Sequence, residues 1–165
     1  MSEADPIMTG IMAAQELANG GDRAGARAAF ASLWEQVGPD GDPLHTVTLA
    51  HYMADVQDDP ADELEWDLRA LRAADSLTDE RAQRHHSSLQ VAGFYPSLHL
   101  NLAADYVKVG DDDSARSHLD SAEAVCSALP DDGYGATIRG AVARLRDRLG
   151  PADRFPTAQR GPRMP

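Results

Sequence analysis

Positive charge is scarce in this sequence. Its 165 residues hold 15 Lys and Arg against 27 Asp and Glu, for a net charge of −12, and Lys108 is the only lysine. The near absence of lysine, with abundant Ala, Gly, Asp and Pro, indicates a high-GC bacterial genome. A body this acidic repels phosphate, so we expect no nucleic-acid partner.

Long apolar runs are also missing. No stretch reaches the roughly 20 apolar residues that a membrane-spanning helix needs. The first five residues, Met1 to Asp5, carry acids where a signal peptide carries bases. We therefore expect no membrane association and a cytoplasmic location.

Cysteine is limited to Cys126, which excludes an internal disulfide. That residue lies in an alanine-rich helical run, so we expect a buried, inert thiol. A single domain of this size buries roughly 70% of its unfolded surface. The fold should therefore need neither a disulfide nor a metal.

Aromatic residues make up only 5% of the chain, and β-branched residues are sparse. Both types favour strands, whereas the alanine and leucine that dominate here favour helices. The expected fold class is therefore all-α, with about seven helices. Helical spacing of apolar residues and Gly or Pro punctuation place them at about 6–18, 22–37, 43–56, 60–76, 97–109, 114–129 and 134–149.

Acidic residues gather beside Gly or Pro at the points where a helical pattern begins. Examples are Asp22, Asp59 and Asp111. Acids at such positions accept the free N–H groups of a helix start and complement the helix dipole. We therefore assign most of the acidity to helix capping rather than to a partner.

The C-terminal part carries the opposite charge. Residues 138–165 hold seven arginines against two aspartates, or +5, which leaves −17 for the rest. Residues 150–165 contain four prolines and three arginines without a core-forming pattern, so we expect a disordered tail. Such a tail is solvated, lies on the acidic body, or engages another molecule.

A repeat-like pattern of small and large residues organises the chain. Its clearest copy has the residues Leu102, Ala103, Tyr106, Gly110, Ala115, Leu119 and Ala122. This spacing resembles the tetratricopeptide repeat (TPR), in which small residues let two helices approach and large residues fill the space between pairs. A second copy has Ala13, Ala14, Leu17, Gly21, Ala26, Phe30 and Leu33, and a degenerate third begins at Leu49.

The resemblance implies a short right-handed α-solenoid of antiparallel helix pairs within a domain of residues 1–149. Its units are about 7–37, 43–76 and 96–129, and 134–149 is a capping helix. The turns at Gln57 and Gly110 are 53 residues apart, longer than the family period of about 34. An extra helical segment at 78–93 would account for the excess, and a generic antiparallel bundle is the alternative architecture.

The first helix of each TPR pair lines a concave face that binds peptides. By register, the resemblance places partner-binding candidates at Gln15, Asn19, His51, Asp55, Leu100 and Lys108. The lysine and asparagine pattern with which one subgroup clamps a C-terminal carboxylate is absent here. We therefore do not expect an acidic peptide to bind.

Catalytic and metal-binding patterns are weak. The best pair, His51 and Asp55, is spaced i, i+4 on one helix, which suits a surface or groove pair. No HExxH, CxxC or serine-elbow motif accompanies the histidines, and spacing suggests no buried carboxylate pair. We expect no enzyme activity, no metal and no cofactor.

Three aromatic residues remain as candidate anchors for a partner. Phe94 and Tyr95 adjoin a helix break, where they either fill a gap in the repeats or bind a partner. Trp66 lies beside the stripe that Leu64 and Leu68 define. It either packs on the adjacent repeat unit or belongs to a surface that contacts a partner.

These features favour a protein- or peptide-binding adaptor that uses a concave helical face. A self-associating accessory module of a bacterial regulatory system, with a homodimer as its form, is the alternative. An enzyme with a histidine-based site is a third and weaker hypothesis.

Overall fold

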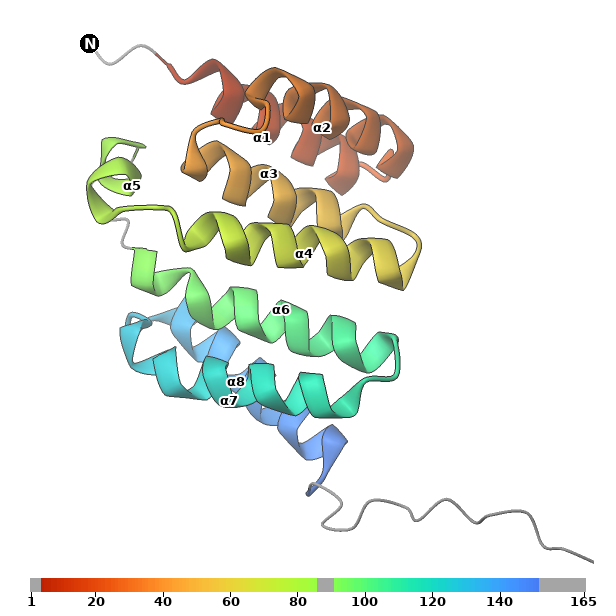
Figure 1. The fold of residues 1–165 in the computed structure, drawn as a ribbon, viewed down its shortest axis with the longest axis vertical. Helices are drawn as coiled ribbons and strands as arrows, with labels where there is room; N and C mark the ends of the chain where they lie inside the picture. The colour runs from red at the N-terminus through yellow and green to blue at the C-terminus, as the bar shows by residue number, and fades with distance from the viewer. Residues whose placement is uncertain (1–3, 86–90, 152–165) are drawn as a thin grey trace, which may run out of the picture.

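The computed structural model describes residues 4–85 and 91–151, and within these ranges the protein is all-helical, without a strand (Figure 1). This confirms the expected fold class. None of the described helices has the length and apolarity that crossing a membrane requires. The α-helices are α1 (Pro6–Asn19), α2 (Arg23–Val37), α3 (Pro43–Asp55), α4 (Pro60–Ala74), α5 (Asp79–His85), α6 (Tyr95–Lys108), α7 (Asp112–Val125) and α8 (Gly133–Leu149), with 3₁₀ turns η1 (Val91–Gly93) and η2 (Cys126–Ala128).

Aspartate side chains cap the helix starts, as the sequence predicts. Asp22 accepts a hydrogen bond from the Gly25 N–H, and Asp111 accepts one from the Ser114 N–H. Asp42, Asp59 and Asp132 do the same for α3, α4 and α8. These carboxylates satisfy backbone donors that have no partner inside the helix.

Consecutive helices form three hairpins, α1–α2, α3–α4 and α6–α7, which follow one another along the molecule (Figure 1). The turns after α1 and α6 place Gly21 and Gly110 at φ of +92° and +82°, a conformation that favours glycine. Helix α8 packs against α6 and α7. The last helix therefore covers one end of the stack.

The apolar core is divided among three clusters along the stack. The first joins α1, α2 and α3 around Phe30 and Met53. The second lies between α3, α4 and α6 around Ala70 and Leu98, and the third joins α6, α7 and α8 around Leu119. Each hairpin therefore completes its core only with its neighbour.

The buried face of α4 differs from the expected one. Leu64 and Leu68 are half-buried, whereas Ala70, Ala74 and Asp67 are buried. The neighbouring helices approach α4 along its alanines, because small side chains allow close packing. The leucines therefore flank the contact instead of forming it.

Two other residues of the expected apolar stripes are exposed. Leu17 is 42% exposed and Val109 is 41% exposed, and each lies in the last turn of a helix or just after it. Helical spacing predicts the face of a residue, but the end of a helix can extend beyond the element that covers it. An apolar residue at helical spacing is therefore not necessarily buried.

The expected helical segment at 78–93 is helical over most of its described residues. Its described parts are α5 and η1, and residues 86–90 lie outside the described ranges, as do tail residues 152–165. An ion pair between Arg81 and Asp42, at the start of α3, ties α5 to the stack.

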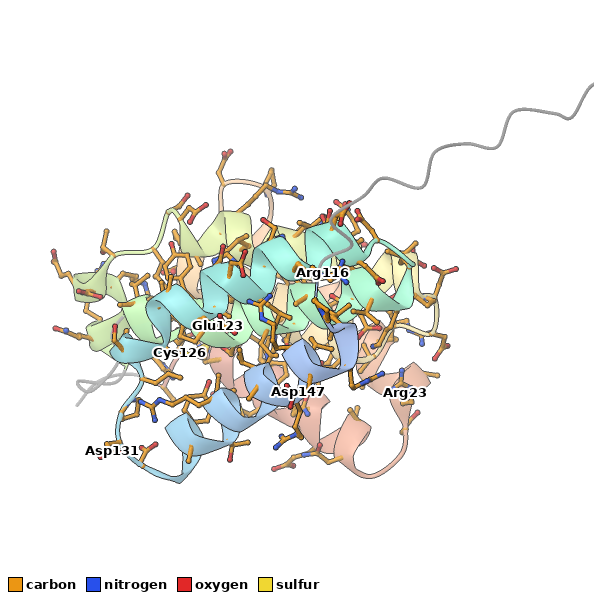
Figure 2. All side chains as sticks on the ribbon, turned by 90° about the horizontal axis from the view of Figure 1, so that it is seen from below. Arg23, Arg116, Glu123, Cys126, Asp131 and Asp147 are labelled. Carbon is orange, nitrogen blue, oxygen red and sulfur yellow. The ribbon has the colours of Figure 1, made fainter. Side chains whose placement is uncertain are left out.

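Cys126 was expected to be buried in a helix. It is half-buried in η2, because α7 ends at Val125 (Figure 2).

Candidate functional site

A hollow of about 340 Å³ opens between α3, the start of α6 and the start of α8. It is the most promising site because three elements that are distant in sequence contribute to it. Its lining residues are Val47, Thr48, His51, Tyr52, Phe94, Ser97, Leu98 and Tyr134.

Helical spacing puts these side chains on one side of each helix. On α3, Val47 and His51 are four residues apart, and so are Phe94 and Leu98 at the start of α6. Tyr134, in the first turn of α8, is 53% exposed and closes the hollow from a third direction. The resulting wall is apolar and aromatic, with a few hydroxyl groups and one imidazole.

His51 connects the hollow to a polar cluster behind it. The Asn101 side-chain nitrogen, on α6, lies 3.2 Å from His51 Nδ1, and Asp67 Oδ1, on α4, lies 3.8 Å from the same atom. With Asn101 donating to Nδ1, the neutral imidazole carries its proton on Nε2. Protonation of Nδ1 would turn the ring into a donor toward Asp67.

The carboxylate nearest to His51 is therefore not the expected one. Asp55, one turn along α3, affects His51 only through its charge, whereas Asp67 forms the ion pair. Burial disfavours the charged imidazole, but the ion-pair contact with Asp67 and the charges of both aspartates outweigh it. The pKa of His51 is consequently raised above its usual value.

A buried carboxyl pair lies directly behind His51, contrary to the expectation from spacing. Asp67 on α4 and Asp105 on α6 are each only 2% exposed. Their side chains lie within hydrogen-bonding reach of each other, and Glu63 also adjoins Asp105. Sequence spacing missed the pair because its members come from helices almost 40 residues apart.

This pair holds a proton at neutral pH. Burial comes first among the causes, and the hydrogen bonds and charges of Asp67 and Glu63 add to it, so the pKa of Asp105 is raised to about 9. Two adjacent buried carboxylates cannot both be ionised without a large energetic cost. The protonated Asp105 therefore donates to Asp67 and joins α4 to α6.

Other polar groups continue the cluster toward the ends of α3, α4 and α6. Lys108 Nζ donates to both carboxylate oxygens of Glu63, at 2.7 and 2.9 Å. Apart from the other carboxyl of the pair, Asp67 Oδ1 and Asp105 Oδ2 have no hydrogen-bond partner among the described residues. The cluster therefore has more acceptor atoms than donors to satisfy them.

The other predicted groove residues do not line the hollow. Gln15 donates to Asn19 along α1, at 3.2 Å. Leu100 is half-buried against the cluster beneath α8, and Lys108 is bound to Glu63. Of the six groove candidates, the structure brings together only His51, Asp55 and Lys108, around the polar cluster.

The three candidate aromatic anchors have separate surroundings. Trp66 packs edge-on against Trp34, with ring centroids 4.9 Å apart. The Tyr95 hydroxyl donates to Asp75 at 2.7 Å, and Phe94 packs on the central core while also lining the hollow. Phe94 is therefore the only one of the three that belongs to the site.

Two histidines meet elsewhere, between α6 and α7. His99 Nδ1 and His118 Nδ1 are 3.0 Å apart, so one ring donates to the other. Burial, and for His99 also the charge of His118, lowers both pKa values and favours the neutral rings. The described part of the chain holds no group of three or more His, Cys, Asp or Glu suited to a metal ion.

The sequence did hold a signal for the missed residues. Asp67 lies three residues before Ala70, and Asp105 lies three residues after Leu102, so each acid belongs to the buried stripe of its helix. Asn101 and Ser97 are four residues apart on the same side of α6. An acid in a buried stripe needs a hydrogen-bond partner on the facing helix.

The arrangement is suited to binding an apolar group in the hollow, with hydrogen bonds from its rim. Comparisons with protein-family models, with curated proteins and with solved structures found no match. Functional inference therefore depends on the geometry of the site.

Proposed function

We propose that the protein is a TPR-like binding module that takes a peptide segment of a partner protein in the hollow between α3, α6 and α8. The order of helix hairpins and the repeat-like residues around Gly21 and Gly110 support the TPR-like arrangement. In that family the first helices of successive pairs line the binding face. Helices α3 and α6 are such first helices, and both line the hollow.

The observation that carries the proposal is the composition of the hollow wall. Tyr52, Phe94 and Tyr134 supply aromatic surface, which dominates the energetics of peptide recognition. The Nε2–H of neutral His51 supplies a donor for a peptide carbonyl. An apolar wall with a few oriented polar groups is typical of binding pockets.

Binding is favoured over catalysis because the reactive groups are out of reach. Asp67 and Asp105 are 2% exposed, so neither carboxyl touches a molecule in the hollow. The Ser97 hydroxyl donates to the Phe94 carbonyl at 3.0 Å, and among the described residues no hydrogen bond joins it to His51. The hollow thus lacks an activated nucleophile.

Affinity capture from the native lysate tests the proposal. The double variant His51→Ala/Tyr134→Ala removes the imidazole and the most exposed aromatic side chain, and Glu35→Ala, at an exposed position of α2, is the control. We expect a partner that wild type and control retain and the double variant loses, with equal helicity by circular dichroism. A partner retained by all three proteins would place the binding site elsewhere.

Self-association is a second candidate function, favoured by the surface of α1. Met12 and Leu17 are 50% and 42% exposed on this terminal helix. A second copy packed against α1 would bury one or both of them. Light scattering across a concentration series, with Met12→Glu as the variant, should then show a dimer that the variant weakens.

A further inference from the structure

The carboxylate of Asp55, at the end of α3, has no bonding partner in the part of the chain that the structure describes. Among the described residues, no side chain or backbone group forms a hydrogen bond or ion pair with it. Lys108, the only lysine of the sequence, is bound to Glu63 through two short contacts. Asp55 is nevertheless exposed, so a molecule on this face can reach it.

The surroundings of Asp55 are unfavourable to its own charge. Neighbouring protein atoms partly desolvate the carboxylate, although the residue is exposed, and this raises its pKa first; the charge of His51 opposes the rise, and the charges of Asp67 and Glu63 add to it. The charge of Lys108 lowers the Asp55 pKa, but less than desolvation and the neighbouring acids raise it. A cation placed beside Asp55 would remove this imbalance, because opposite charge favours the ionised carboxylate.

The acids behind Asp55 strengthen the preference for a cation. Asp67 Oδ1 and Asp105 Oδ2 are buried, in side chains that are 2% exposed, and in the described part of the chain they have no hydrogen-bond partner outside their own pair. With Asp105 protonated, the three carboxylates of Asp55, Glu63 and Asp67 face one lysine and one histidine. The field at the surface of this cluster is therefore negative, and it opposes an acidic ligand.

The hollow and Asp55 lie along the same helix. From Thr48 in the hollow to Asp55 is seven residues, or about 10 Å along a helix axis. An extended peptide covers that distance in about three residues. One short segment can therefore fill the hollow and reach Asp55 at the same time.

We infer that the partner segment is a basic peptide, with a large apolar side chain in the hollow and an arginine or lysine about three residues away at Asp55. This inference rests on the proposed function and specifies its ligand. The aromatic rings of Tyr52 and Tyr134 hold the apolar side chain, and the Asp55 carboxylate accepts from the cation. The acidic net charge of the protein accelerates encounter with such a segment.

Selection from a random eight-residue peptide library displayed on phage tests this inference. The library is selected on wild-type protein at 0.15 M salt (about 8 Å screening length), so that weak long-range attraction is reduced. The consensus peptide is then measured by fluorescence anisotropy against Asp55→Asn and against Glu35→Gln, which removes the same charge from an exposed position of α2. Tyr52→Ala probes the hollow.

We expect a consensus with a basic residue two to four positions from an apolar one. Asp55→Asn should weaken its binding about tenfold, equivalent to about 1.4 kcal/mol, and Glu35→Gln less than about twofold. A consensus without basic residues, or equal binding by Asp55→Asn and wild type, overturns the inference. If peptides that fail this test still lose binding to the Tyr52→Ala variant, the hollow binds peptides and the proposed function stands. If no selected peptide depends on Tyr52, both the proposed function and the basic-peptide inference fail.

Discussion

Asp105 on α6 hydrogen-bonds Asp67 on α4, and each side chain is only 2% exposed. The pair lies where the second and third hairpins meet, and its Asp67 contacts His51, which lines the hollow. It therefore links the stability of the stack to the state of the site. Direct pairing of two acids in a core is stable only because one of them keeps its proton.

Replacing Asp105 by asparagine should make the protein less sensitive to pH. In the wild type, Asp105 keeps a proton up to about pH 9 when folded and loses it near 3.8 when unfolded, so stability falls as pH rises between these values. The asparagine amide replaces the O–H donor and does not titrate. Urea unfolding should show the variant gaining at least about 1 kcal/mol over wild type between pH 5 and pH 8; a constant difference would show that Asp105 is ionised.

The imidazole of His51 should titrate above the usual histidine range because of Asp67. NMR titration of the ring nitrogens measures this, and His99 and His118, whose pKa values are lowered, serve as internal controls. Asp67→Asn should lower the His51 pKa and leave the other two unchanged, since it removes the negative charge nearest to Nδ1 in the His51 ion pair. A His51 pKa below 6.5 in the wild type would falsify the assigned contact.

The ion pair between Arg81 and Asp42 should stabilise the protein measurably. Their side chains are 16% and 28% exposed, so solvent screens them only partly. Arg81→Ala should cost about 1–2 kcal/mol and increase hydrogen exchange in α5. The matched control is Arg72→Ala, whose contact with Glu65 is exposed and should be worth about 0–0.5 kcal/mol. Equal costs would argue against the role of Arg81 in holding α5.

Two glycines of α8 should respond oppositely to alanine. A Cβ at Gly135 would lie 2.0 Å from the Pro130 carbonyl oxygen, whereas at Gly140 it would meet only the flexible end of Arg144, at 3.1 Å. Gly135→Ala should therefore destabilise the fold by about 2 kcal/mol or more. Gly140→Ala should stabilise it by about 0.5–1 kcal/mol through helix propensity. Thermal unfolding of both variants measures these effects. If Gly135→Ala stabilised the protein, the close approach of Gly135 to the Pro130 carbonyl would be contradicted.

Local sequence was sufficient to predict the helices and their starts. Asp22, Asp59 and Asp111 cap helices where their spacing places them, and Gly21 and Gly110 occupy the tight turns. A helix cap is a hydrogen bond between residues two or three positions apart, so both partners can be read from one turn of sequence. For the same reason the all-α class could be predicted from composition.

The buried face of α4 and the partner of His51 required the tertiary structure. The leucine stripe pointed to Leu64 and Leu68, whereas the structure buries Ala70. His51 and Asp55 interact through charge, but the ion pair of His51 is with Asp67, which comes from another helix. The prediction for α4 failed because a helix offers several faces of similar composition. Close packing against a second helix selects the face with the small side chains.

The buried carboxyl pair behind the hollow also depends on the tertiary structure. Asp67 and Asp105 are 38 positions apart, and nothing in the local pattern of either residue specifies the other. The sequence determined that each acid lies in the buried stripe of its own helix. Only the packing of α4 against α6 brought the two carboxyls together, because burial leaves a polar group no partner except one on the facing helix.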